Sequence, residues 1–222
     1  MDENKKAPST SSENKSISLP ISTTRNAAQL RALIVHEVGV HAERAQNGEE
    51  TGLKILKSGT ANYAAVEEGL GVLMECLISG STDNPAYHRA RDRYITAGLA
   101  LGEDGGGARD ARQTYEILWR IIASRRNEKG IITNEIIEHA KEDAYDHVEN
   151  AFRGTNFAMP GMIYSKLKIY REGLIQNIKY FSDNIDDVTS ALNRAMIGKY
   201  DHTNETERLT VKNEISRGGD IE

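Results

Sequence analysis

The stretch LRALIVHEVGVHAERAQNG, residues 30–48, carries the strongest signal for the fold. Apolar residues recur in it at helical spacing, at Leu30, Leu33, Ile34 and Val38. This spacing predicts an amphipathic α-helix. Thr23 or Thr24 is expected to cap the start of this helix, and Asn47-Gly48 is expected to end it.

Within this helix, His36-Glu37-Val38-Gly39-Val40-His41 reads HExxxH, one residue longer than the HExxH of zinc peptidases. A regular helix would separate the two histidines by about 140°, whereas the shorter motif brings its histidines within about 40°. A local π-turn, with about 4.4 residues per turn, would bring them back to within roughly 50°. Gly39 lies between the histidines, where a backbone distortion is least hindered. The spacing therefore predicts a π-bulge or a broken turn over residues 37–41.

A second helix is expected after a polar loop that ends at Gly59, with Thr60 as its cap. It contains Glu67-Glu68-Gly69-Leu70-Gly71, two acids within an otherwise apolar helix. At least one acid should face inward and need a partner, and a metal ion could be that partner. Zinc needs a third protein ligand and an open position for water. A plainer alternative remains, because histidines and acids on amphipathic helices are often surface or helix-pairing residues.

Helix signals continue along the rest of the chain, and convincing strands are nearly absent. Asp83-Asn84-Pro85 predicts the start of a third helix, because proline fits the first helical turn. The segment GEDGGG, residues 102–107, is expected to be a loop. Further helices are expected at about 109–126, 133–152, 162–180 and 186–197. The predicted fold class is mainly α, a zincin-like metallopeptidase helical core with at most a small N-terminal sheet or edge strand.

The 222 residues suit one compact core between two polar ends. Residues 1–16 are rich in Ser, Lys, Asn and Glu, which predicts a disordered tail. Residues 17–200 are expected to form the catalytic core, and residues 201–222 a loose C-terminal tail. The core is expected to open with a short edge strand or an extended lead-in over 17–21, because a proline lies inside an alternating pattern.

Charge and hydropathy exclude several classes of partner. The net charge is -5, and no block of Lys and Arg is long enough to neutralise a run of phosphates, so nucleic acid is not expected as a partner. Membrane partners are not expected either, since neither a spanning stretch nor a signal peptide is present, and a cytoplasmic protein is predicted. The single cysteine, Cys76, lies in an apolar run typical of a buried helix face.

Five ordered motifs resemble the tyrosine carboxypeptidase family, which includes the microtubule-associated tubulin carboxypeptidases and bacterial proteins named for a Gln-Glu-Gly-Leu-Ala motif. They are VHEVGVHAERAQNG, AAVEEGLGVL, AFRGT at 151–155, MIYSKLKIYREGL at 162–174 and AMIGK at 195–199. The resemblance covers roughly residues 25–200. The ordered series is more specific than any single motif.

The resemblance implies a Zn²⁺ ion held by His36, His41 and Glu68, with Glu37 as the general base that activates a zinc-bound water. Glu67 matches a neighbouring Gln or Glu of the family and is not assigned to the metal. The implied reaction removes a C-terminal residue, typically tyrosine or another aromatic residue. The C-terminus of a peptide or protein is therefore the expected partner.

A carboxypeptidase must also hold the free C-terminal carboxylate, for which a guanidinium, an ammonium or a phenol hydroxyl is suited. Arg153, Lys166 and Tyr170 match motif positions of this chemistry. They are expected to contact the substrate carboxylate or the oxyanion. A cap on a helix end or a solvated helix face is the alternative role for each.

Two departures from the family pattern bear on function. The Lys-Asp pattern of the family reads Lys166-Leu167, and its Gly-Leu-Ala reads Gly69-Leu70-Gly71, so local packing or substrate contacts are expected to differ. Family members usually carry a long region before HExxxH, whereas about 35 residues precede it here. A partner chain or a missing N-terminal region would then complete the cleft.

The alternative function is a non-catalytic helical binding or regulatory module, a shortened family member that keeps the scaffold with or without the metal. The short segment before HExxxH favours this alternative. Retention of Glu37 favours the enzyme, since a purely structural metal site needs no general base.

Overall fold

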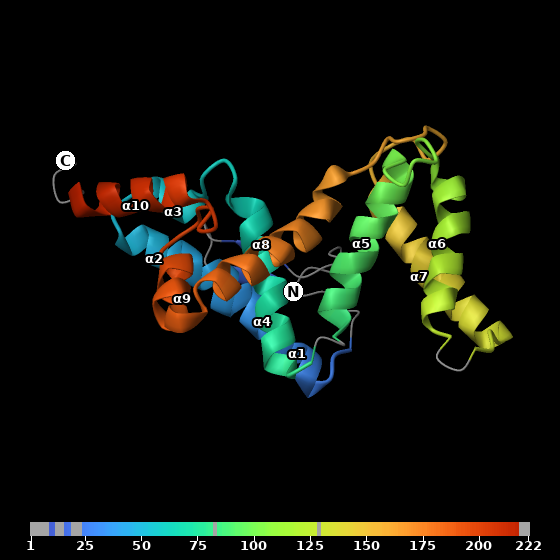
Figure 1. Cartoon of the computed structure of the whole chain (residues 1–222), viewed down its shortest axis with the longest axis horizontal. Coiled ribbons are helices and arrows are strands. Elements are labelled where there is room, and N and C mark those ends of the chain that lie inside the picture. Colours follow the sequence, from blue (N-terminus) through green and yellow to red (C-terminus); the bar gives the residue numbers. More distant parts are fainter. Residues whose placement is uncertain (1–8, 12–15, 19–23, 82–83, 128–129, 218–222) are drawn as a thin grey trace. The chain divides into compact units, whose positions relative to one another are not determined.

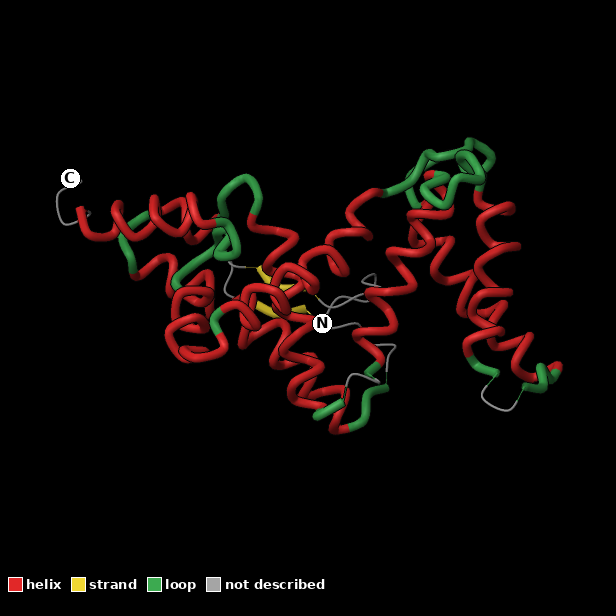
Figure 2. Tube along the Cα trace, viewed as in Figure 1, coloured by secondary structure: helices red, strands yellow, loops and turns green. Residues whose placement is uncertain are grey.

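The computed structural model describes residues 9–11, 16–18, 24–81, 84–127 and 130–217. These residues form mostly helices, with one antiparallel pair of short strands described near the N-terminus (Figure 1, Figure 2). The predicted mainly α fold class is confirmed. No helix among the described residues is long and apolar enough to cross a lipid bilayer.

The chain divides into two compact units, one formed by Met1–Tyr87 with Glu172–Glu222 and the other by His88–Arg171. The single core expected over residues 17–200 is therefore divided between them. The physical reason is that the second unit buries a hydrophobic cluster of its own, in which Leu118, Ile122 and Phe152 are almost fully inaccessible to solvent.

The first unit contains the strands and most of the helices. Its complete elements are β1 (Ser9–Ser11), β2 (Ser16–Ser18), α1 (Ala27–His36), the π-helix η1 (Glu37–Ala42), α2 (Glu43–Glu50), α3 (Lys54–Ser58), α4 (Tyr63–Ser79), the 3-10 helix η3 (Ile185–Asp187), α9 (Val188–Met196) and α10 (Glu205–Arg217). In the strand pair, Ser9 lies opposite Ser18 and Ser11 opposite Ser16. β1 lies close to η1, and α1 packs along α4.

The second unit is built on α6 and α7, which pack against each other. Its complete elements are α6 (Ala111–Arg125), α7 (Asn134–Phe152) and the 3-10 helix η2 (Ser165–Lys168). Two further helices, α5 (Pro85–Leu101) and α8 (Ile169–Asp183), each have residues in both units. The predicted start of α5 at Pro85, the turns over 102–107 and the Thr133 cap of α7 are confirmed. The helix expected over 162–180 begins later, as η2 and then α8.

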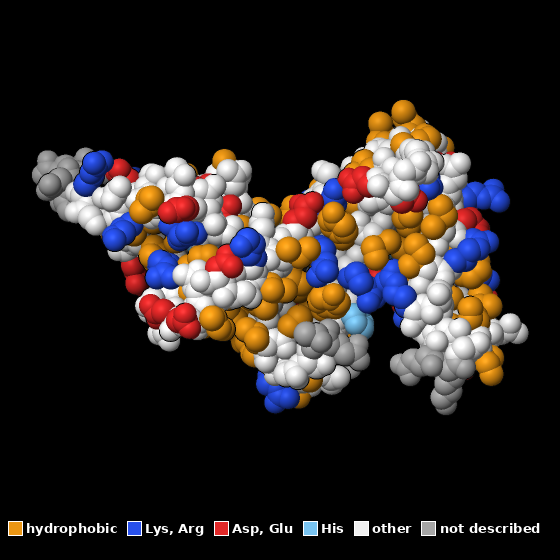
Figure 3. Space-filling view, viewed as in Figure 1, with side chains coloured by type: hydrophobic (Ala, Val, Ile, Leu, Met, Phe, Trp, Pro, Cys, Tyr) orange, Lys and Arg blue, Asp and Glu red, His pale blue; other side chains and the backbone are white. Residues whose placement is uncertain are grey.

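On the face drawn in Figure 3, exposed hydrophobic side chains lie among side chains of both charge signs. Leu30 and Ile34 on α1 and Leu77 near the end of α4 are exposed apolar residues of the first unit. This face therefore carries both apolar and charged side chains.

The predicted ends of the first long helix are wrong. Asn26 caps α1 in a capping box with Gln29, while Thr24 precedes the cap and Thr23 lies outside the described residues. Asn47-Gly48 does not end the helical run, which continues in α2 to Glu50. Both residues serve tertiary contacts: the Asn47 side chain donates to the Met196 carbonyl at 2.8 Å. A Cβ at Gly48 would lie 2.2 Å from the Leu56 carbonyl oxygen.

The expected cap of α4 is also wrong, because Asn62 rather than Thr60 precedes its first residue. The Thr60 hydroxyl instead donates to the Glu207 carboxylate of α10 at 3.1 Å. Its backbone N–H donates to the Lys199 carbonyl at 2.9 Å. Thr60 therefore connects the α3–α4 loop to the C-terminal part of the first unit.

The expected tails are ordered over part of their length. Residues 205–217 form α10, and Val211 packs with Leu56 and Tyr200, so the predicted loose tail over 201–222 is wrong for this helix. Val211 and Ile215 are the residues of this polar helix that pack against the hydrophobic cluster. Residues 9–11 and 16 of the predicted disordered tail are in the strand pair, because backbone pairing orders them. The remainder, 1–8, 12–15 and 218–222, lies outside the described residues.

Residues 17–21 were expected to form an edge strand or an extended lead-in. Residues 17 and 18 belong to β2. Residues 19–21 lie outside the described residues.

Helices α4 and α8 cross with their backbones in contact at Gly69 and Gly173. A Cβ at Gly69 would lie 2.0 Å from the Gly173 carbonyl carbon, and a Cβ at Gly173 would lie 1.7 Å from the Ala65 carbonyl oxygen. Asn177 ties the crossing together, because its buried amide donates to the Val66 carbonyl at 2.9 Å and to the Gly173 carbonyl at 2.8 Å. The position of α4 therefore depends on glycine at this crossing.

His202 is buried against the same crossing as a neutral ring. Both hydrogens of the Asn177 amide are used by carbonyls, so Asn177 Oδ1 accepts and His202 Nε2 donates at 2.9 Å. Burial lowers the pKa of His202 well below its ordinary value of 6.5, and the charges of Arg44 and Arg208 lower it further. The folded protein therefore keeps this ring uncharged in mildly acidic solution.

We predict that Gly173→Ala lowers the free energy of unfolding by about 1–3 kcal/mol, because the added methyl meets backbone atoms that must shift. Urea unfolding followed by circular dichroism measures this change. Gly39→Ala is the matched control in the same unit, since no neighbouring atom lies within 4 Å of its added Cβ. Equal unfolding midpoints for wild type and Gly173→Ala would contradict the close crossing.

We also predict that the contribution of His202 to the unfolding free energy falls as the pH is lowered from about 7 to 5.5. The unfolded His202 binds a proton below 6.5 and the folded ring does not, so stability is lost progressively as the pH falls through that value. His202→Gln keeps an amide donor toward Asn177 without titrating and should show a smaller pH slope. Identical slopes for the two proteins would count against a buried neutral His202.

Candidate metal centre

The π-helix η1 brings the two histidines of HExxxH onto one side of the helical run. His36 is the last residue of α1, and His41 lies in η1. Their ring centroids are 4.9 Å apart, with an angle of 60° between the ring planes. The prediction of a π-bulge over 37–41 is confirmed.

Glu68 on α4 faces the Nε2 atoms of both histidines. Its Oε2 atom lies 3.6 Å from His36 Nε2 and 3.8 Å from His41 Nε2. In the described part of the chain, these three side chains form the group of His, Cys, Asp or Glu residues that could hold a metal, with ligand atoms within 4.8 Å of one another. Zn–ligand bonds of about 2.0–2.2 Å would place tetrahedral ligand atoms roughly 3.3–3.6 Å apart, so the donor atoms are close to the required spacing.

The other ring nitrogen of each histidine is held by a carboxylate. His36 Nδ1 lies 2.7 Å from Glu75 Oε1, and His41 Nδ1 lies 2.8 Å from Glu67 Oε1. An ionised carboxylate only accepts hydrogen bonds, so each Nδ1 carries a hydrogen, which leaves each Nε2 as the atom that would bind a metal ion beside Glu68. Histidine ligands of metal ions commonly have such a carboxylate on the other nitrogen.

The electrostatics of this cluster favour a positive charge at His36. Burial by itself would lower the pKa of His36, but the carboxylates of Glu68 and Glu75 raise it to about 9. Three acids thus surround two histidines in a largely buried space. A divalent cation at the Nε2 atoms would take the place of that proton, so the donor set fits a metal ion.

Glu67 is the most buried acid of the cluster, with an exposed fraction of 3%. Burial would raise its pKa, but hydrogen bonding with His41 and the charges of Arg44 and Lys199 lower it below the ordinary value. Arg44 Nη1 lies 3.1 Å from Glu67 Oε2, and Lys199 Nζ lies 3.3 Å from Glu67 Oε1. Glu67 is therefore an ionised, buried carboxylate beside the predicted ligand His41.

Glu37, the predicted general base, is the first residue of η1 and is half-buried. It follows His36 directly and therefore lies at the candidate centre along the chain. Its part in proton transfer stays a prediction.

The three predicted carboxylate contacts lie in the second unit, whereas the candidate metal centre is in the first. The Arg153 guanidinium follows the end of α7 and lies 4.4 Å from the centroid of the Tyr164 ring. The Tyr170 ring lies 4.7 Å from the Arg93 guanidinium, and Lys166 is an exposed residue of η2. The structure thus brings the three predicted metal ligands together. The roles of Arg153, Lys166 and Tyr170 in binding the substrate carboxylate stay predictions.

Sequence reasoning missed Glu75 and the partners of Glu67. A signal was present, because Glu75 lies seven residues after Glu68 and is a further acid within the apolar part of α4. Gly71 also belongs to the site, since a Cβ there would lie 2.6 Å from His36 Cε1. The Gly-Leu-Gly departure from the family pattern therefore leaves room for the His36 ring.

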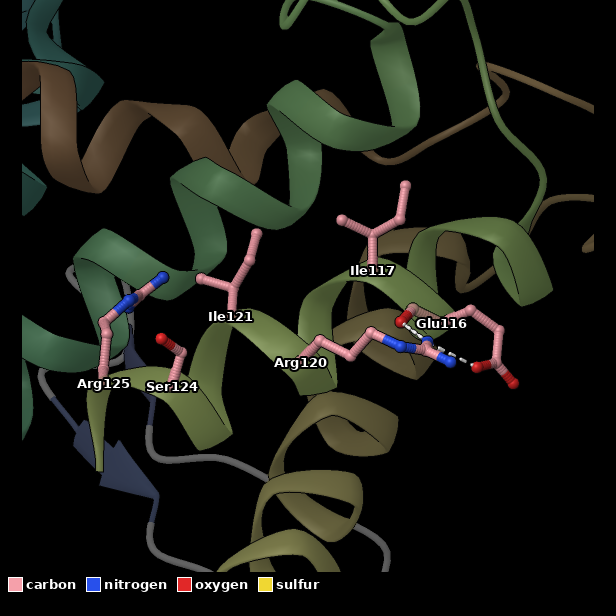
Figure 4. Close-up of a pocket in the computed structure, with 6 residues that line it drawn as sticks. All are labelled: Glu116, Ile117, Arg120, Ile121, Ser124 and Arg125. Atoms are coloured by element: carbon pink, nitrogen blue, oxygen red, sulfur yellow. Dashed lines mark hydrogen bonds and ion pairs between the residues drawn. The ribbon is translucent and has the colours of Figure 1, made fainter. Parts of the chain in front are cut away.

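A surface hollow of ≈ 560 Å³ lies elsewhere, in the second unit. All of its lining residues belong to α6: Glu116, Ile117, Arg120, Ile121, Ser124 and Arg125 (Figure 4). Arg120 pairs with Glu116 one turn away. This hollow contains none of the predicted site residues.

Comparison with known proteins supports the resemblance over the N-terminal half of the chain. Residues 6–105 match the family described as "Microtubule-associated tyrosine carboxypeptidase". No curated protein and no solved structure matches the chain. The matched residues include the HExxxH segment and all three predicted metal ligands. Over residues 6–105, the chain is therefore similar to the microtubule-associated tyrosine carboxypeptidase family.

Proposed function

We propose that this protein is a zinc-dependent carboxypeptidase that removes a C-terminal aromatic residue, typically tyrosine, from a peptide or protein. The observation that carries the proposal is the position of Glu68 within 3.6 and 3.8 Å of the Nε2 atoms of His36 and His41. The family suggests tyrosine carboxypeptidase activity, which favours peptide hydrolysis over other zinc chemistry.

In this proposal His36 and His41 hold zinc through Nε2, and Glu68 holds it through a carboxylate oxygen. Two imidazoles and one carboxylate form a common ligand set of zinc peptidases and leave a position open. When bound, zinc would supply Lewis acidity that polarises the scissile carbonyl and acidifies water. Glu37 would accept a proton from the attacking water and pass it to the leaving amine.

Recognition of the free C-terminal carboxylate is assigned in the proposal to Arg153, Lys166 and Tyr170. Their support is chemical, since a guanidinium, an ammonium and a phenol can all bind a carboxylate. Removing the positive charge of Arg153 or Lys166 should then raise KM for peptides more than it lowers kcat.

We expect about one zinc ion per chain in the purified wild type, and its loss in His41→Ala and in Glu68→Ala. Elemental analysis measures the metal, and circular dichroism checks that each variant remains helical. Glu37→Gln is the control, because it should retain zinc. A folded wild type that takes up no zinc even after zinc is added would refute the proposal.

We further expect Glu37→Gln to lower kcat by about 10²–10⁴-fold while zinc content is unchanged, because the variant lacks the base. The measurement is release of tyrosine or phenylalanine from peptides that end in these residues. The same peptides with an amidated C-terminus should not be cleaved. Zinc-loaded wild type that releases no residue from any of them would favour the non-catalytic module instead.

A further inference from the structure

Glu67 joins the candidate metal centre to a segment from the C-terminal part of the first unit, Lys199–His202, hereafter the 199–202 segment. Glu67 Oε1 faces His41 Nδ1 at 2.8 Å and Lys199 Nζ at 3.3 Å. Its other oxygen, Oε2, accepts from Arg44 Nη1 at 3.1 Å. One buried carboxylate thus connects a predicted metal ligand with two cations.

Arg44 extends this connection to the backbone of the segment. Its side chain is fully buried, and Nη2 donates to the Tyr200 carbonyl at 2.7 Å. The segment is also bound through its own backbone, because the Lys199 N–H donates to the Leu56 carbonyl at 2.7 Å. His202 completes the docking through its hydrogen bond with Asn177. The docked segment therefore supplies one of the two cations that neutralise Glu67, Lys199, and accepts a hydrogen bond from the other, Arg44.

The second histidine provides an internal comparison. His36 Nδ1 is held by Glu75, whose backbone carbonyl accepts from the Asn84 amide at 3.3 Å. Glu75 thus holds its histidine near the end of α4 and the start of α5. The two Nδ1 contacts can be weakened separately, one at Glu75 and the other at Glu67.

We propose that Glu67, Arg44 and Lys199 are positioning residues that couple divalent-cation binding at His41 to docking of the 199–202 segment. A cation on His41 Nε2 makes the Nδ1–H a stronger donor and favours a Glu67 carboxylate held in one orientation. Arg44 and Lys199 hold that orientation from the opposite side. Coupling between two binding equilibria is reciprocal, so the docked segment raises cation affinity as much as the cation stabilises the docked segment.

This inference rests on the proposed zinc site, and its test uses the full chain with zinc. Lys199→Met removes the ammonium but keeps the backbone hydrogen bonds of the segment, and Lys199→Arg restores a cation. Competition with a chromophoric chelator should show zinc affinity on the order of 10-fold weaker in Lys199→Met and largely restored in Lys199→Arg.

Hydrogen exchange at the Lys199 and Tyr200 amides gives the second measurement. Zinc should slow exchange at these amides in the wild type and have little effect on them in Lys199→Met. Glu75→Gln is the matched control: it should bind zinc more weakly, yet at saturating zinc it should show the same protection of the 199–202 segment as the wild type.

Two results would overturn the coupling: wild-type zinc affinity in Lys199→Met, or a zinc effect on the 199–202 amides that is the same in both proteins. Either result, in protein that binds zinc, removes this inference and leaves the zinc site in place. A wild type that binds no zinc removes the proposed function and the coupling together.

Discussion

Three carboxylates on α4 determine how the first unit packs. Glu67 and Glu75 are buried, and Glu68 is largely so, on a helix that otherwise presents apolar residues. Ionised groups in such surroundings are costly unless hydrogen-bonded or paired with opposite charge. Most of the partners come from one continuous helical run, since His36, His41 and Arg44 follow one another through α1, η1 and α2, while Lys199 is a further partner of Glu67. This run must therefore lie against α4.

Glycines set how closely these elements approach. Gly69 and Gly173 allow α4 and α8 to cross at backbone contact, which leaves the adjacent Glu68 facing the histidines. Gly71 leaves space for the His36 ring on the same helix. The π-helix supplies the remaining adjustment, because one additional residue per turn rotates His41 onto the side of His36. Local backbone geometry and helix crossing thus act together to gather the donor atoms.

The sequence predicted most helices correctly but placed several ends and tails wrongly. Asn47-Gly48 has the composition of a helix end, yet α2 continues through it because both residues are used by contacts with Met196 and Leu56. α10 was not predicted, since its composition is polar and its docking depends on a few apolar contacts, those of Val211 and Ile215. Where a helix ends, and whether a polar helix docks, depend on contacts with residues elsewhere in the chain. A local sequence pattern carries no information about these contacts.

For the candidate site, the sequence by itself determined the spacing of HExxxH, the need for a π-turn and the choice of Glu68, because these follow from helix geometry and the family motifs. Only the tertiary structure decided that Glu75 and Glu67 hold the two Nδ1 atoms, and that Arg44 and Lys199 neutralise Glu67. Lys199 lies far from Glu67 in the sequence, and their pairing arises because burial of a charged group demands an opposite charge from wherever the folded chain brings one.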